Sequence, residues 1–176
     1  MYALGVNPFD IKALERLFEV KKRPKNMPIS VAVSNIKMMK TIAYVNNIAE
    51  KIYEKFLPGP ITLLLKKKEN VPDLLTSGDD KVAIRVPSHP LAMKMIDMVG
   101  IITATSANIH RNPEPKNLDI ALGQLGEKVS LYLDCGECQY KKASTIVDVS
   151  YYSTKIIRKG VILPEEILKI INQDLK

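Results

Sequence analysis

The chain has 176 residues, of which 46% are hydrophobic and 26% charged, so it can bury the core of one domain and is not a disordered protein. No apolar run approaches the ~20 residues that a membrane span requires, and the first residues lack the pattern of a signal peptide, so we expect a cytoplasmic protein. The net charge of +7 favours an anionic partner such as a nucleotide, RNA or an acidic membrane, without choosing among them.

Helical and strand patterns alternate along the first half of the chain. An apolar face over residues 11–18 predicts a helix with Asp10 as its N-cap. The Arg23–Pro24 pair ends this helix, because the residue before proline avoids the α region. Apolar runs predict the other elements of this half, which are a strand over 29–33, a helix over 48–56 ended by "PGP", and strands over 61–65 and 82–86.

The second half continues the same alternation. Ser88 is expected to cap a short helix over residues 89–98, "GIITAT" is predicted to be a strand, and the polar run "SANIHRNPEPKN" a loop. The remaining predicted elements are a helix over 118–125, strands over 130–134, 144–149 and 154–158, and a helix over 163–176. This order predicts one α/β domain with a mixed sheet.

The segment "KKRPKNMP", residues 21–28, carries four cations within five positions. Cations at the end of a helix are electrostatically favourable, so a solvated helix end is one interpretation. The other is a phosphate-binding segment, since the planar arginine fork and the lysine ammonium both suit phosphate oxygens. The segment alone leaves both interpretations open.

Other motifs place polar side chains within or beside apolar strands. "TSAN", residues 105–108, directly follows an apolar run, which is typical of ligand sites in open α/β sheets and also of turns and helix caps. "AIRVP" puts Arg85 inside an apolar strand, where a charge must face solvent, a partner or a pocket. "STIVDV" and "IIRKG" set a polar or basic residue at the edge of an apolar run. "PGPIT", residues 58–62, is interpreted as a break between two elements.

Cys135 and Cys138 form a single C-x-x-C pair, and zinc normally requires four ligands, so we predict ordinary loop cysteines and no metal site. The sequence contains no phosphate-binding P-loop, no GxGxxG and no nucleophile elbow. His89 and His110 lack a visible triad partner, so no acid–base or covalent machinery is predicted.

Seven motifs occur in a fixed order, namely "YALG", "KKRP", "PGPIT", "AIRVP", "TSAN", "STIVDV" and "IIRKG". This order resembles the YrdC-like family of threonylcarbamoyl-AMP synthases over most of the chain. The resemblance implies one YrdC-like domain over residues 1–176, with a YrdC/RibB-like fold in which helices surround a twisted mixed sheet and a basic cavity.

The resemblance also implies a reaction. L-threonine, bicarbonate and ATP, carried with Mg²⁺, would give threonylcarbamoyl-AMP and pyrophosphate. A tRNA threonylcarbamoyl-transfer complex would then pass the group to adenosine in tRNA. The family's pattern implies no tightly bound cofactor, no protein-held metal and no membrane partner.

The same motifs imply site residues. Lys21 and Arg23 resemble the family's catalytic ligands of the ATP phosphates. Arg85 matches an arginine associated with the threonine carboxylate, and Ser144 lies in the threonine pocket. The other implied ATP-binding residues are Ser106 and Asn108 of the SxN element, Arg158, and Lys81 at a weaker contact position.

Family members begin with a strand, a helix and a "PT-x-T-x-Y-G-L-G" element, and this sequence starts within that element. We therefore expect Met1 to be an internal methionine of a longer protein, so that the domain here lacks the family's first strand and helix. Positions that differ from the family pattern are Ala3, Lys22, Met27, Ala32 and Lys116.

Two alternatives remain open. The first is a non-catalytic or altered-substrate relative that binds double-stranded RNA, tRNA or a nucleotide; the +7 charge favours it, while an aromatic content of 6% offers few stacking residues. The second is a carbamoyl-transfer domain like those of hydrogenase-maturation proteins, which share this fold within long multidomain chains. The length of this chain argues against it.

Overall fold

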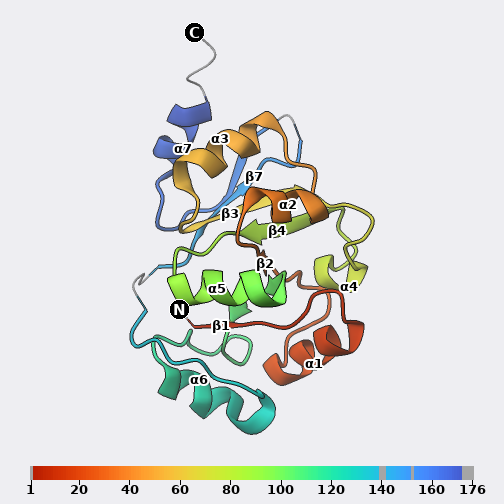
Figure 1. Cartoon of the computed structure of the whole chain (residues 1–176), viewed down its shortest axis with the longest axis vertical. Coiled ribbons are helices and arrows are strands. Elements are labelled where there is room, and N and C mark those ends of the chain that lie inside the picture. The colour runs from red at the N-terminus through yellow and green to blue at the C-terminus, as the bar shows by residue number, and fades with distance from the viewer. Residues whose placement is uncertain (1, 139–141, 152, 172–176) are drawn as a thin grey trace.

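A mixed sheet of six strands forms the centre of the computed structural model, which describes residues 2–138, 142–151 and 153–171 (Figure 1). β2 runs parallel to β4 and β3 runs parallel to β7, while the other neighbouring pairs are antiparallel. This arrangement confirms the predicted mixed sheet. In spatial order the strands are β5 (Ile102–Thr103), β2 (Val31–Ala32), β4 (Lys81–Arg85), β3 (Ile61–Lys66), β7 (Thr145–Asp148) and β8 (Lys155–Arg158).

A second, two-stranded sheet joins the start of the chain to the "TSAN" segment. β1 (Ala3–Leu4) pairs antiparallel with β6 (Thr105–Ser106), with Ala3 opposite Ser106. Ser106 therefore has a fixed backbone position at the start of the segment that had been predicted to be a loop.

Helices cover the sheet and extend the molecule at both ends (Figure 1). α3 and α7 lie together at one end, and α1 and α6 lie at the other. No described helix has the length and apolar character needed to cross a membrane. The helices are α1 (Ile11–Lys21), α2 (Ile36–Ile42), α3 (Asn47–Phe56), α4 (Asp73–Thr76), α5 (Pro90–Val99), α6 (Leu118–Leu125) and α7 (Pro164–Ile171), with a 3₁₀ turn at Gly126–Lys128.

The two faces of the central sheet differ in burial. On β4, Val82 and Ile84 are fully buried, whereas Lys81, Ala83 and Arg85 are half-buried. Because side chains alternate along a strand, these two sets point to opposite faces. The register places Thr62 of β3 opposite Arg85, so Thr62 lies on the same half-open face as Arg85 and Lys81.

α1 forms as predicted and ends at the basic segment. The Asp10 side chain accepts a hydrogen bond from the Ala13 amide at 3.1 Å, which is the expected N-cap. Leu14, Leu17 and Phe18 face the core. Lys22 adopts the left-handed conformation, with φ of 50°, and so ends the helix directly after Lys21.

Several predictions from sequence are wrong in detail. Residues 130–134 form no strand; Leu131 and Leu133 are 70% and 40% exposed, and no described strand pairs with them. Ser88 does not cap α5, because the helix begins one residue later, with His89 at the cap position and Pro90 as its first residue.

The sequence analysis also missed two helices, α2 and α4, and overestimated one strand. Only Val31 and Ala32 of the predicted strand over 29–33 form ladder pairs, and "GIITAT" divides into β5 and β6. α7 confirms the predicted C-terminal helix as far as Ile171, and residues 172–176 lie outside the described residues.

Candidate functional site

The last residue of α1, Lys21, binds the "TSAN" segment through its side chain. Its exposed fraction is only 1%. Nζ donates to the backbone oxygen of Ser106, to the backbone oxygen of Asn108 at 2.7 Å and to Asn108 Oδ1 at 3.3 Å. The Lys21 carbonyl in turn accepts from the His110 amide at 2.7 Å. Lys21, Ser106 and Asn108, far apart in the sequence, therefore form one hydrogen-bonded group.

Side chains of the SxN element are held in the same group. The Ser106 hydroxyl donates to Asn108 Oδ1, and Asn108 Nδ2 donates to the Asn112 carbonyl at 2.6 Å. Asn108 is itself buried, with 5% of its surface exposed. Both side chains are therefore fixed by the protein.

The Lys21 ammonium lies among neutral oxygens and forms no salt bridge with a described carboxylate. Burial, together with the nearby charge of Arg23, lowers the pKa of Lys21 to about 8, while Glu114 acts in the opposite direction. The amine is thus still mostly protonated at neutral pH. A buried cation without an anionic partner favours binding of an anion.

Arg23 lies beside this group and is held by the turn that follows α1. Its Nε donates to the Met27 carbonyl at 3.2 Å and its Nη2 to the Pro28 carbonyl at 2.9 Å. Burial lowers the pKa of Arg23. We call Lys21, Arg23, Ser106 and Asn108 the first group.

A second group lies on the half-open face of the sheet and consists of Thr62, Arg85, Ser144 and Arg158. The hydroxyls of Thr62 and Ser144 are 2.8 Å apart. Arg158 donates through Nε to the Ser144 carbonyl and through Nη2 to the Ser144 hydroxyl, each at 3.1 Å. Ser144 is therefore bound both from β3 and from β8.

Gly160 permits this close approach of β8 to the start of β7. A Cβ at Gly160 would lie 2.4 Å from the Ala143 oxygen, the Ser144 carbon and the Thr145 nitrogen. The Gly160 amide also donates to the Thr145 hydroxyl at 3.1 Å. No larger residue fits here without a shift of backbone.

Arg85 is the least satisfied member of the second group. Its Nε is buried and has no hydrogen-bond partner among the described residues. Burial lowers the pKa of Arg85, and the nearby charge of Arg158 adds to this effect. Two arginines and two hydroxyls on one face offer several donors to a carboxylate or phosphate.

β2 follows the turn that holds Arg23 and pairs with the strand that carries Arg85. Pro28, which binds Arg23, precedes β2, and Ala32 at the end of β2 is paired with Arg85. Pro28 and Ala32 are four positions apart, a span of at most about 14 Å for extended chain. The turn that holds Arg23 therefore leads directly into the strand that pairs with Arg85.

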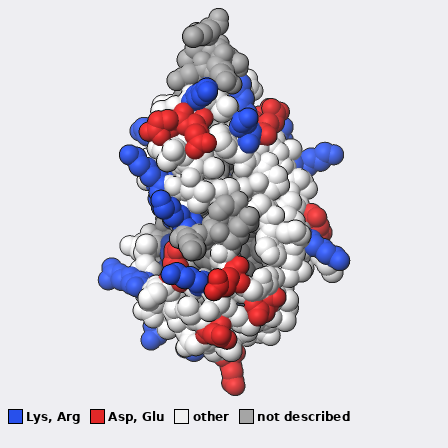
Figure 2. Space-filling view, turned by 90° about the vertical axis from the view of Figure 1, so that its left-hand side faces the viewer, with Lys and Arg blue, Asp and Glu red and all other residues white. Residues whose placement is uncertain are grey.

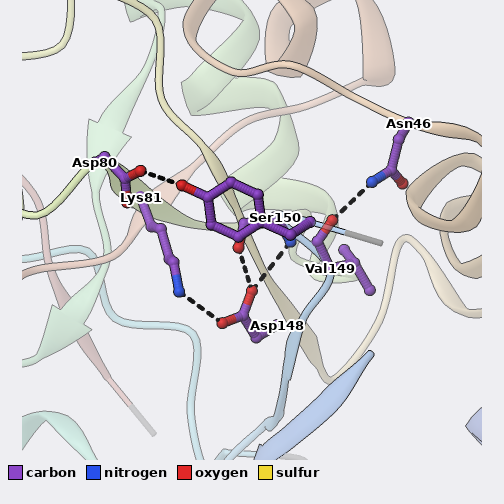
Figure 3. Close-up of polar contacts among 7 residues, drawn as sticks. Asn46, Asp80, Lys81, Asp148, Val149 and Ser150 are labelled. Atoms are coloured by element: carbon purple, nitrogen blue, oxygen red, sulfur yellow. Dashed lines mark hydrogen bonds and ion pairs between the residues drawn. The ribbon is translucent and has the colours of Figure 1, made fainter. Parts of the chain in front are cut away.

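Lys81 shares the sheet face and belongs to neither group (Figure 3). Nζ lies 2.9 Å from Asp148 Oδ2 and 5.5 Å from the centre of the Tyr151 ring, whose hydroxyl donates to Asp80. The bond to Asp148 raises the pKa of Lys81. Burial alone would raise the pKa of Asp148, but bonds from Ser150 and Lys81 outweigh this and lower it. The predicted ATP contact of Lys81 stays a prediction.

The described residues contain no group of three or more His, Cys, Asp or Glu side chains that could hold a metal ion. Cys135 is exposed, Cys138 is half-buried, and both are free thiols. Figure 2 shows Lys and Arg side chains along one side of the face it draws, beside a broad area with few charges. The basic cavity expected from the family stays a prediction.

The sequence analysis named seven residues that these two groups contain, and it missed Thr62 and Gly160. "PGPIT" contains Thr62 and "IIRKG" contains Gly160, so both lie in motifs that had been noticed. Their importance depends on the pairing of β3, β7 and β8, which no local pattern reveals.

A family model, Sua5/YciO/YrdC, described as "Telomere recombination", matches residues 1–160. The chain belongs to the Sua5/YciO/YrdC family. This membership confirms the resemblance seen in the sequence. Relatives with known sequences and structures can therefore be compared with this chain.

Several members of the Sua5/YciO/YrdC family are similar along nearly the whole chain. A putative threonylcarbamoyl-AMP synthase of Methanocaldococcus jannaschii is 36% identical, over 92% of this chain and 76% of the relative. The Sua5 structure from Pyrococcus abyssi in complex with L-threonine is 34% identical with a TM-score of 0.93, and Escherichia coli YciO is 25% identical with a TM-score of 0.80. The alignments cover 98% of this chain and 51% of Sua5, and 91% of this chain and 79% of YciO.

The chain thus spans about half the length of Sua5 and about three-quarters of the relative from M. jannaschii. The likeness establishes the fold of the shared part.

Proposed function

We propose that this protein is an L-threonylcarbamoyladenylate synthase, which makes threonylcarbamoyl-AMP from L-threonine, bicarbonate and ATP for the modification of tRNA. The observation that carries the proposal is a pair of buried cationic side chains that form no ion pair with a described carboxylate. These are Lys21, whose ammonium donates only to neutral oxygens, and Arg85, whose buried Nε has no hydrogen-bond partner among the described residues. Relatives named threonylcarbamoyl-AMP synthase support the same function.

The reaction requires positioning more than proton transfer. The threonine amine adds to the carbon of bicarbonate with loss of water, which gives a carbamate. A carbamate oxygen then attacks the α-phosphorus of ATP, and the bond to the departing pyrophosphate breaks. The carbamate oxygen is already anionic, so the phosphoryl step needs no strong base. The protein instead must align the reactants and stabilise phosphate charge.

In this proposal the first group binds the phosphates. Lys21 contributes a point charge and Arg23 a planar fork, while Ser106 and Asn108 lie beside them as neutral partners. Arg158, at the end of β8, would also bind the nucleotide. Mg²⁺ would arrive on the triphosphate as part of the substrate.

The second group would bind L-threonine. The guanidinium of Arg85 offers the buried N–H donor that a carboxylate accepts, and Ser144 lies on the same face. A site built around a buried unpaired donor discriminates against ligands that lack the matching acceptor.

Pyrophosphate release tests the proposal. The purified chain with ATP, Mg²⁺, L-threonine and bicarbonate should release pyrophosphate, and omission of either threonine or bicarbonate should abolish the release. Arg23→Ala should raise the KM for ATP, and Arg85→Met should raise the KM for threonine. Pyrophosphate formation independent of threonine, or none from the folded protein, would overturn the proposal.

RNA or tRNA, a tRNA threonylcarbamoyl-transfer complex and a cytoplasmic location stay predictions. So does the single domain that lacks the family's first strand and helix. The +7 charge keeps an RNA-binding function as the second candidate. Such binding would weaken steeply as salt increases, because it depends on phosphate contacts.

A further inference from the structure

We propose that Thr62 is a positioning residue for Ser144 and so determines how tightly the second group holds L-threonine. This inference rests on the proposed function. Thr62 ends the "PGPIT" motif, which otherwise has no part in the site.

The Thr62 hydroxyl forms its one described hydrogen bond with Ser144. Its side chain is buried, with 4% exposed, on the half-open face of β3. The two hydroxyls lie 2.8 Å apart, and no other hydrogen bond of the Thr62 side chain occurs among the described residues. A buried hydroxyl with a single partner on a neighbouring strand serves to fix that partner.

The register explains why the contact forms. β3 and β7 run parallel, with Thr62 opposite Ile146, and the Thr145 amide donates to the Pro60 carbonyl at 3.0 Å. Ser144 therefore lies at the entry to β7, beside β3. Because Gly160 holds the end of β8 against this entry, Arg158 reaches Ser144 from the opposite side.

The hydrogen count shows what this arrangement provides. The hydroxyls of Thr62 and Ser144 carry one hydrogen each, and the bond between them uses one of these two hydrogens. The Ser144 oxygen also accepts from Arg158 Nη2, which fills a further acceptor position. If Thr62 donates, both acceptor positions of Ser144 are filled, and the Ser144 hydrogen is directed to a third group.

In this inference Thr62 is the donor of the pair, and the third group is a ligand acceptor. Arg85, directly opposite Thr62 in the strand register, presents its buried unpaired Nε on the same face. The Ser144 hydroxyl and the Arg85 guanidinium thus form two donors for one carboxylate. Without Thr62, the Ser144 hydroxyl can rotate and donate elsewhere, so the second donor is lost for part of the time.

Thr62→Val and Thr62→Ser test this role. Valine keeps the shape and removes the hydroxyl, so the KM for L-threonine should rise about tenfold, as expected for one lost hydrogen bond, with the KM for ATP within about twofold of wild type. Serine keeps the hydroxyl and should restore most of the threonine affinity. Thr76→Val is the matched control, because Thr76 is a buried threonine whose described side-chain hydrogen bonds go to Lys67, Asp73 and Asp79 around α4.

The control separates positioning from general stability. Thr76→Val should lower Tm without changing the ratio of the two KM values. An unchanged KM for threonine in Thr62→Val would overturn the inference. So would equal increases in both KM values with a lowered Tm, or failure of Thr62→Ser to restore affinity.

A crystal structure of Thr62→Val gives a readout that does not depend on activity. The inference predicts that the Ser144 hydroxyl leaves its position beside Arg158 Nη2; a Ser144 side chain that keeps this position contradicts it. If wild-type protein makes no threonine-dependent pyrophosphate while Ser144 still rotates in the variant, the proposed function fails and the positioning role stands.

Discussion

At the scale of single residues, Lys21 combines burial, charge and contact with the "TSAN" backbone. Its pKa of about 8 lies close to the working range of an enzyme. The residue is therefore the one whose ionisation should be visible in the pH dependence of activity.

We expect kcat/KM for ATP to be level below pH 8 and to fall as pH rises through about 8, since Lys21 then loses the charge that attracts phosphate. Lys21→Arg keeps the charge, so any activity it retains should lack this step. A rate profile that is level through pH 9 in the wild-type protein would contradict this role of Lys21.

The stability of the fold changes with pH in the opposite direction to the expected fall in kcat/KM. The pKa of Lys21 is lowered from 10.5 to about 8 on folding, so between these values the unfolded chain binds more protons than the folded one. This group therefore makes the protein more stable as pH rises through that window. Tm measured across the same pH range distinguishes the two effects.

Gly160 gives a second prediction at this scale. Gly160→Ala should destabilise the fold by about 1–3 kcal/mol and weaken threonine binding, because its Cβ would lie 2.4 Å from backbone atoms of residues 143–145. Gly123→Ala is the control. Gly123 lies in α6, and a Cβ added there would meet no atom within 4 Å, so this variant should stabilise the fold by ~0.5–1 kcal/mol. Denaturant unfolding measures both; equal effects of the two variants would contradict the account.

At the scale of elements, Asn46 joins α3 to the end of β7. Its Oδ1 accepts from the Ala49 amide at 2.9 Å as the helix N-cap, and its Nδ2 donates to the Val149 carbonyl at 2.7 Å (Figure 3). One side chain thus caps a helix and satisfies a carbonyl just beyond the strand.

Asn46→Ala should therefore destabilise the protein by more than the ~1 kcal/mol typical of a lost cap, because the tertiary bond to Val149 is lost as well. Asn117→Ala is the matched variant; Asn117 caps α6 through the Ile120 amide alone. Chemical denaturation of both variants measures which one loses more free energy of unfolding. An equal or larger loss in Asn117→Ala would show that the Val149 bond contributes nothing.

The elements that the sequence predicted well are those with a strong apolar pattern and a clear end. α1 has Asp10 at its start, and the β4 and β7 sequences are apolar runs that a proline or a polar turn bounds. α2 was missed although Asn35 caps it and Met39 and Ile42 are buried three residues apart. That signal was present and was not used.

Tertiary pairing accounts for the remaining differences. The predicted strand at residues 130–134 has a strand-like composition, but none of the described strands pairs with it, so it stays irregular. β1 and β6 pair across about a hundred residues, and neither is distinctive alone. The family motifs predicted the members of the two groups, whereas Thr62 could be recognised only from the register of β3 with β4 and β7.

At the scale of the whole molecule, the fold assembles two sets of donors from segments that lie far apart in the sequence. The first comes from the end of α1 and from "TSAN", and the second from β3, β4, β8 and the start of β7. The proposed adenylate product, threonylcarbamoyl-AMP, would contact both sets.

Detection of labelled product tests this claim most directly. With ¹³C-bicarbonate, L-threonine and MgATP, mass spectrometry should find threonylcarbamoyl-AMP that carries the label in its carbamoyl carbon, in amounts equal to the pyrophosphate released. Arg23→Ala and Arg85→Met should each reduce it. Pyrophosphate or AMP without labelled threonylcarbamoyl-AMP, from folded wild-type protein, would contradict the account.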